Sequence, residues 1–177
     1  METTQAVQHI NIIRHLIPED GNIPNNPLIP LLIYQKVILL PQENPGQYVI
    51  ELFEENGWEN AWEDSIHDFH HYHSITHEVL GVIKGSARVQ FGGSSGVVIL
   101  IETGDVVVIP AGVAHKAIDI YDEFKCIGAY PAGYNYDMNY GREEELRKAI
   151  ENIKAVPIPP TDPVYGIEGP LVTNWKI

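Results

Sequence analysis

Between residues 62 and 130, apolar and polar residues alternate in short runs separated by turn-forming residues. A repeat of two residues is typical of β-strands, and the close spacing of the turns favours an all-β barrel or sandwich. Turns are expected where glycine and proline gather, at 84–85, 92–96, 103–105 and 110–112. The expected strands cover residues 66–73, 77–83, 86–91, 96–101, 106–109, 114–120 and 124–130.

Two helices are expected, one before this strand region and one after it. Residues 44–56 begin with Asn44-Pro45, a favourable cap and first helical residue, and end at Asn56-Gly57. Their apolar residues recur three and four apart, as on one face of a helix. Residues 142–154 have an acidic first turn and a similar apolar stripe, which predicts a second amphipathic helix.

The two ends of the chain are rich in proline. Residues 1–41 are expected to form an arm, with strands at 7–17 and 31–40 joined by a stiff segment that suits neither a helix nor a central strand. Residues 155–177 contain five prolines but also large apolar side chains, which predicts a tail packed on the domain. Because no repeat or linker is found, residues 1–177 are expected to form a single domain.

Histidines gather at the start of the strand region. Four of the eight histidines and one glutamate fall within residues 70–78. Alternate side chains of a strand point the same way, so His71 and His73 are expected to face one interior, which Glu78 joins if the chain bends. The distant His115 can supply a fourth ligand. Three imidazoles and a carboxylate form a site suited to one divalent ion of Mn, Fe, Co, Ni or Zn.

Strand alternation also predicts what surrounds the ligands. If the ligands point inward, Phe69, Leu80 and Val82 do so too, either as pocket walls or as ordinary barrel core. From His115, the same alternation brings Asp119 inward, where it is a candidate general base or a loop anchor. A mostly apolar cavity beside a metal is the composition expected of a small-molecule site.

Two spaced patterns carry a family resemblance. They are His71-x-His73-x4-Glu78-x6-Gly85 and Gly104-x5-Pro110-x-Gly112-x2-His115. In this order they resemble the two motifs of the cupin superfamily, small β-barrels that hold a divalent metal on three histidines and a glutamate. The resemblance implies a cupin barrel (a double-stranded β-helix or jelly roll, RmlC-like) with His71, His73, Glu78 and His115 as ligands. His77 points away from Glu78 on a regular strand and is the alternative ligand.

The sequence departs from the cupin pattern at two positions. Ser65 stands where the first motif begins with glycine, and Asp119 stands where the second ends with asparagine. Further segments resemble the uncharacterised YjlB-like group of single-domain cupins, and the resemblance extends over nearly the whole chain. These segments are residues 23–27, 56–58, 70–74, 77–81, 162–166 and 169–171.

The resemblance leaves the reaction open, because one fold serves many functions. Cupins include dioxygenases, decarboxylases, isomerases, storage proteins and sugar-binding regulators. The first hypothesis is a metalloenzyme that acts on a small organic molecule, with the metal as a Lewis acid. The alternative is a non-catalytic protein that binds a metal or a small ligand. A regulatory sensor is a third and weaker hypothesis, because no DNA-binding domain is predicted.

Composition narrows the partners. The 11 basic and 24 acidic residues give a net charge of −13, which argues against binding to nucleic acid or an anionic membrane. The one cysteine permits no intrachain disulfide, and the N-terminus has no signal-peptide pattern, so a cytoplasmic location is expected. The longest apolar stretch, residues 28–40, is too short to span a bilayer. Homodimerisation through the apolar segments 7–17 and 31–40 is a further hypothesis.

Overall fold

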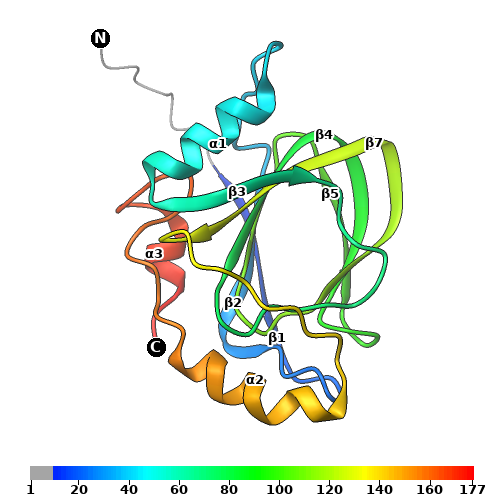
Figure 1. The fold of residues 1–177 in the computed structure, drawn as a ribbon. Coiled ribbons are helices and arrows are strands. Elements are labelled where there is room, and N and C mark those ends of the chain that lie inside the picture. The colour runs from blue at the N-terminus through cyan, green and yellow to red at the C-terminus, as the bar shows by residue number, and fades with distance from the viewer. Residues whose placement is uncertain (1–9) are drawn as a thin grey trace.

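The structure is a computed structural model that describes residues 10–177, and its strands curve around a common interior (Figure 1). The strands form a 7-stranded antiparallel sheet in the order β1-β2-β6-β4-β7-β3, with β5 paired to β4. The strands are β1 (Asn11–Ile17), β2 (Asn26–Gln35), β3 (Trp58–Asp64), β4 (Glu78–Phe91), β5 (Val97–Glu102), β6 (Val106–Ile109) and β7 (His115–Pro131). The helices are α1 (Pro45–Glu55), α2 (Glu143–Ala155) and α3 (Pro170–Asn174). The expected all-β barrel is therefore confirmed.

The first part of the central strand β4, from Glu78 to Ile83, is buried on both of its faces. Leu80 and Val82 belong to the apolar cluster inside the barrel, whereas Val79 belongs to a second cluster, which includes residues of α1 and α3. This division follows the two-residue period of a strand. Gly81 lets α1 approach closely, because a Cβ there would lie 2.8 Å from the side chain of Val49.

The expected turn at 84–85 is wrong, because β4 and β7 are each one long bulged strand. The β4–β7 pairing shifts register on both sides of Lys84, and Gly85 takes a φ of +66°. On β7, Asp122 and Glu123 take φ values of +55° at the facing position. A Cβ on residue 85 would collide with the carbonyl oxygen of Tyr121, so the bend requires glycine.

The strand expected at 66–73 is also wrong. The strand in this part of the chain is β3, which ends at Asp64, before residue 66, and pairs with β7. Residues 65–70 contain no strand, while His71 and Tyr72 make isolated bridges to His115 and Asn139. The direction of the side chains in this segment, which includes His71 and His73, is therefore not set by the alternation of a regular strand. The segment makes only isolated bridges to the sheet.

In the N-terminal arm, β1 lies within the expected strand 7–17, of which residues 7–9 fall outside the described part of the chain. Strand β2 begins at Asn26 and includes Pro27 and Pro30, contrary to expectation. The prolines are tolerated because β1 pairs with β2 at Asn26 and from Leu31 onward, which leaves 27–30 outside the ladder. Residues 36–40 are not a strand. Homodimerisation through this arm stays a prediction.

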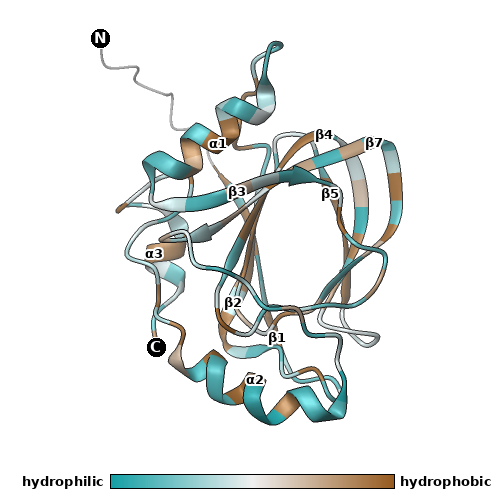
Figure 2. Ribbon diagram, in the orientation of Figure 1, coloured by the Kyte–Doolittle hydropathy of each residue, from teal (hydrophilic) through white to brown (hydrophobic). Residues whose placement is uncertain are grey.

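Helices α1 and α2 form where the sequence predicts them, whereas the short α3 was not expected. Asn44 precedes α1 but makes no side-chain capping bond. Only Ala149 of α2 is buried, in keeping with the mixed, largely hydrophilic colouring of this helix in Figure 2. In the part of the chain that the structure describes, no helix is long and apolar enough to cross a membrane.

The C-terminal tail packs against the barrel through one buried carboxylate. Asp162 is fully buried and accepts a hydrogen bond from the Tyr34 hydroxyl at 2.6 Å. It also accepts hydrogen bonds from the backbone N–H groups of Val164, Tyr165 and Leu171. These four hydrogen bonds offset the free-energy cost of burying the carboxylate. The bond from Tyr34 joins the tail to β2.

We expect Asp162→Ala to lower the free energy of unfolding by about 3 kcal/mol or more, because it leaves two buried and two part-buried donors without their acceptor. The matched change Tyr34→Phe removes only one of the four bonds and is expected to cost about 1 kcal/mol. Urea titrations measure both values. Equal effects of the two substitutions would contradict a central role for the carboxylate.

Candidate metal centre

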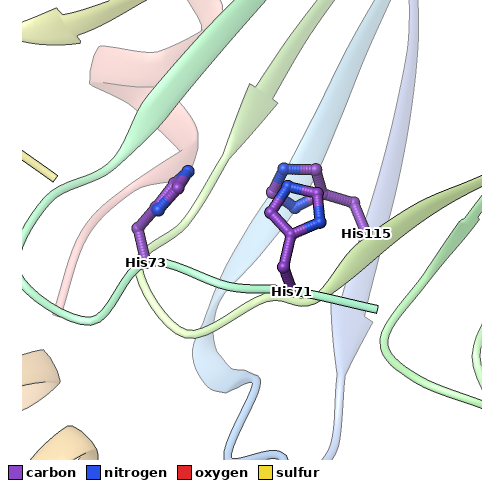
Figure 3. A group of neighbouring side chains, drawn as sticks. All are labelled: His71, His73 and His115. Atoms are coloured by element: carbon purple, nitrogen blue, oxygen red, sulfur yellow. The ribbon is translucent and has the colours of Figure 1, made fainter. Parts of the chain in front are cut away.

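Three histidine side chains from two segments far apart in the sequence converge in the barrel. His71 and His73 lie between β3 and β4, and His115 begins β7. The backbone N–H of His71 donates to the carbonyl of His115 at 3.3 Å, and the reverse bond measures 3.0 Å. One ring nitrogen from each of the three buried imidazoles lies within 4.8 Å of the others (Figure 3).

The Nδ1 atom of each imidazole is held by a backbone carbonyl oxygen. The distances are 3.0 Å from His71 to Phe69, 2.6 Å from His73 to Asp137 and 3.2 Å from His115 to Val113. Because a carbonyl oxygen only accepts hydrogen bonds, the proton of each neutral imidazole must be on Nδ1. The other nitrogen, Nε2, is then left with a free lone pair, which is the form that binds metals.

Glu78, the first residue of β4, adds a carboxylate to this cluster. Its Oε2 atom lies 3.2 Å from His73 Nε2 and 3.3 Å from His115 Nε2, and all three side chains are buried. This oxygen has no hydrogen-bond partner among residues 10–177. The other oxygen, Oε1, accepts a hydrogen bond from the Tyr130 hydroxyl at 3.3 Å.

The donor set fits a divalent cation. With all three protons on Nδ1, unprotonated nitrogens and a carboxylate oxygen gather with no hydrogen between them, an arrangement that needs a positive charge in its midst. Metal–nitrogen and metal–oxygen distances of about 2.0–2.2 Å agree with the spacing of these atoms. A proton on His73 that pairs with Glu78 is the alternative source of that charge.

Burial and mutual charge set the proton affinities of the cluster. Burial, together with the neighbouring His115, lowers the pKa of His71 to about 3. Burial also opposes the charging of His73, but the Glu78 carboxylate outweighs it and raises the pKa of His73. Although burial raises the pKa of Glu78, His73 and His115 hold it below its ordinary value. His71 and Glu78 are thus in the protonation states that a metal requires at neutral pH.

A cavity of about 350 Å³ opens beside the cluster. Its walls carry the histidines and Glu78 together with aromatic and apolar side chains. The lining residues are Trp62, Glu63, Asp64, Ser65, Ile66, His67, His71, His73, Glu78, Leu80, His115, Tyr130, Tyr136 and Met138. This volume is at the low end of those of small-molecule sites.

Several of these residues were not expected from the sequence. Trp62 Nε1 donates to the Tyr130 hydroxyl at 2.8 Å, and the Tyr130 ring stacks on Tyr136 at 5.1 Å. Burial and the Glu78 carboxylate raise the pKa of Tyr130, so its proton remains on the hydroxyl. A signal in the sequence was the stretch 134–140, which contains three tyrosines, but no local pattern places it over the cavity.

Asp137 ties this aromatic segment to the histidines. Its side chain accepts hydrogen bonds from the backbone N–H and the hydroxyl of Ser74 and from the Asn139 amide. Its carbonyl is the one that holds His73 Nδ1. The loop that lines the cavity and the orientation of His73 therefore depend on the same residue.

The residues expected to line the pocket have different outcomes. Leu80 lines the cavity, whereas Val82 is buried in the barrel core and does not. The expectation for Phe69 is wrong: it is 40% exposed and packs on His67 and Tyr140 outside the cavity. The reason is that Phe69 does not belong to a strand, so strand alternation does not set its direction.

The inward position expected for Asp119 is also wrong. Arg88 of β4 pairs with Asp119 on β7, but the next residue, Val89, pairs with Ala117. Ile118 is therefore an extra residue in a bulge, which reverses the alternation beyond it. Asp119 is 42% exposed and forms an ion pair with Arg88 on the outer face, away from the cavity.

His77, the alternative ligand, lies outside the histidine cluster. Its Nδ1 accepts a hydrogen bond from the Ala111 N–H at 2.9 Å, and its Nε2 donates to the Pro157 carbonyl at 3.2 Å. Its ring packs on Trp175. Both nitrogens are therefore engaged in joining β4 to the 110–112 turn and the C-terminal tail.

The sequence and the fold are similar to those of known proteins. Residues 69–126, which include all four proposed ligands, match the family described as Cupin. The chain is 41% identical over 161 residues to the uncharacterised protein YjlB of Bacillus subtilis (strain 168), which covers 91% of this chain and 94% of that protein.

Two of the solved structures that are similar to this chain are enzymes by name, and both have low sequence identity to it. One is acireductone dioxygenase from Bacillus anthracis with a cadmium ion in its active centre, with a TM-score of 0.41, 15% identity and coverage of 62% of this chain and 83% of that one. The other is the epimerase RmlC from Legionella pneumophila Philadelphia 1, with a TM-score of 0.40, 18% identity and coverage of 72% and 73%.

The buried His77 predicts a pH dependence of stability for the metal-free protein. Burial lowers the pKa of His77 to about 4 in the folded state, against about 6.5 in the unfolded chain. Between these values only the unfolded state takes up the proton. The free energy of unfolding therefore keeps the full contribution of His77 above about pH 6.5. It falls by about 3 kcal/mol as the pH falls towards 4.

Urea titrations of the metal-free protein between pH 7 and 4 measure this loss. His71 titrates in the same direction, so the comparison is with His77→Asn, which lacks the His77 contribution but keeps that of His71. We expect a shallower pH dependence in the variant. Parallel curves for the two proteins would show that His77 does not titrate in this way.

Proposed function

The chain belongs to the YjlB-like group of the cupin family, and we propose that it holds one divalent metal ion on His71, His73, Glu78 and His115 and uses this ion on a small organic molecule. The observation that carries the proposal is the hydrogen bonding of the three imidazoles, which places their ring protons on Nδ1. Backbone carbonyls occupy the Nδ1 atoms of all three imidazoles. Their Nε2 lone pairs and Glu78 then need a cation, and a metal is what this donor set binds.

When bound, a divalent ion supplies a Lewis acid that polarises an oxygen of the substrate. The chain itself holds the ligands and shapes the space beside them. Tyr130 donates to Glu78 and so fixes the direction of the carboxylate, while Trp62 fixes Tyr130 in turn. Tyr130, Tyr136 and Met138 cover part of the cavity and reduce its contact with water.

The cavity beside the ligands supports an enzyme rather than a closed structural metal site. A space of about 350 Å³ next to the cluster gives a small molecule access to it. The groups that line the cavity and can transfer a proton include Asp64, His67, Tyr130 and Tyr136. Dioxygenase, decarboxylase and isomerase reactions all remain compatible with such a site.

A non-catalytic metal or small-ligand binding protein is the second candidate. It is favoured by the position of Asp119, the carboxylate first considered as a general base, which forms an ion pair on the outer surface instead. Turnover of any substrate by the metal-loaded protein decides in favour of the enzyme.

Metal content tests the ligand set. We expect protein purified without chelators or a histidine tag to contain about one divalent ion per chain, and the variant His71→Ala/His115→Ala to contain less than about a tenth of that. The matched control is His15→Ala, a histidine on β1 outside the cluster, which should keep the metal. Elemental analysis measures all three. Equal metal in the double variant and the wild type would remove the proposal.

Tyr130 is expected to act on metal affinity through Glu78. Because Tyr130→Phe removes the hydroxyl that orients the carboxylate, we expect metal affinity to fall about 10–100-fold while the fold is kept. Competition with a chromogenic chelator measures the affinity, and thermal unfolding of the metal-free protein checks the fold. An unchanged affinity would mean that Tyr130 does not position Glu78.

A further inference from the structure

Among the described residues, no lysine or arginine lines the cavity beside the histidine cluster. Among its fourteen lining residues there is no lysine or arginine, whereas Glu63, Asp64 and Glu78 are acidic. Two arginines elsewhere on the described chain have partners of their own: Arg88 pairs with Asp119, and Arg142 pairs with Glu145 and lies over the Tyr140 ring. No such group is available to a ligand in the cavity.

The part of the cavity wall that faces the histidines and Glu78 carries aromatic and apolar side chains. The rings of Tyr130 and Tyr136 stack with an interplanar angle of 25°, and the Trp62 indole is hydrogen-bonded to Tyr130. Leu80 and Met138 complete the apolar surface. Flat rings of this kind favour contact with a flat partner.

Gly128 makes room for the Trp62 wall. The indole ring lies so close to the Gly128 backbone that a Cβ at this position would collide with it. Trp62 pairs across the sheet with Gly128, so the close approach is built into the β3–β7 ladder. The aromatic wall is thus a fixed part of the barrel.

The charges of the site limit the charge of its ligand. A divalent ion and the Glu78 carboxylate together carry +2 − 1 = +1, since the imidazoles are neutral ligands. One negative charge placed directly on the metal is therefore compensated. A second negative group, such as a phosphate or a sulfonate away from the metal, meets no lysine or arginine and has the Asp64 carboxylate near it. Burying such a group without a partner is costly.

We propose that the substrate of this site is a small, flat organic molecule that is uncharged apart from the atoms bound to the metal. The proposal rests on the proposed metal-dependent function and deepens it. Phosphorylated, nucleotide-linked and sulfonated molecules are excluded by the same charges. A flat ring that packs on Tyr136 and Trp62 and directs an oxygen at the histidine cluster would contact both the aromatic wall and the metal.

Two matched probes test the charge rule: benzyl alcohol, and the same molecule with a sulfonate on the ring. We expect metal-loaded protein to bind the neutral probe at least about 10-fold more tightly than the sulfonate, measured by ligand-observed NMR titration. Equal binding, or tighter binding of the sulfonate, would overturn the proposal. Binding of neither probe would overturn it too, because the aromatic walls would then not receive a ring.

Met138→Lys supplies the missing cation at a half-buried position of the cavity wall. We expect this variant to narrow the preference for the neutral probe to within about 3-fold, with its fold checked by circular dichroism. Met138→Gln is the matched control: it is polar and of similar length but uncharged, and should keep the wild-type preference. The same shift in both variants would assign the effect to polarity and contradict the charge rule.

Metal analysis of the same samples separates this inference from the proposed function. If the protein binds no metal but still prefers the neutral probe, the proposed function fails and the charge rule of the cavity stands. If it binds one metal ion but prefers the sulfonate, the function stands and the inference fails.

Discussion

The site depends on one set of hydrogen bonds, those that hold the Nδ1 atoms of three imidazoles on backbone carbonyl oxygens. These bonds settle where the ring protons are, and so leave the opposite nitrogens as lone-pair donors. Two of the carbonyls belong to residues only two positions before their histidine, so the local backbone conformation sets the direction of those rings. The third, from Asp137, comes from a distant loop. A metal site of this kind is therefore prepared by the backbone before any ion arrives.

The barrel brings these groups together through its two longest strands. Glu78 begins β4 and His115 begins β7, and the two strands pair along most of their length. Bulges at Gly85 and at Ile118 bend the strands and decide which side chains face the interior. Outside the barrel, Asp162 and His77 join the C-terminal tail to the sheet. These two contacts of the tail are made by residues outside the proposed ligand set.

The surroundings of the cluster define the chemistry that can take place there. An acidic chain with a net charge of −13 lines the cavity beside the cluster with aromatic rings, histidines and carboxylates, and with no lysine or arginine among the described residues. In the proposed site, a bound ion would be the main positive charge that a ligand meets, so it would determine both where a polar group of the ligand lies and how much charge the ligand carries. Tyr130 connects the cavity wall with the proposed ligands, because it lines the cavity and its hydroxyl donates a hydrogen bond to Glu78.

The sequence by itself determined the barrel, both long helices and the four residues proposed as ligands, because strand and helix periods and the spacing of His71, His73, Glu78 and His115 are local properties of the chain. The cupin resemblance follows from that same spacing. The tertiary structure alone decided the direction of Asp119 and Phe69: one extra residue at 118 reverses the alternation on β7, and Phe69 lies outside any strand. It also decided the partners of the cluster, since Asp137 and Tyr130 reach the histidines and Glu78 from more than 50 residues away. Contacts over such distances arise from the closure of the barrel, which no local pattern encodes.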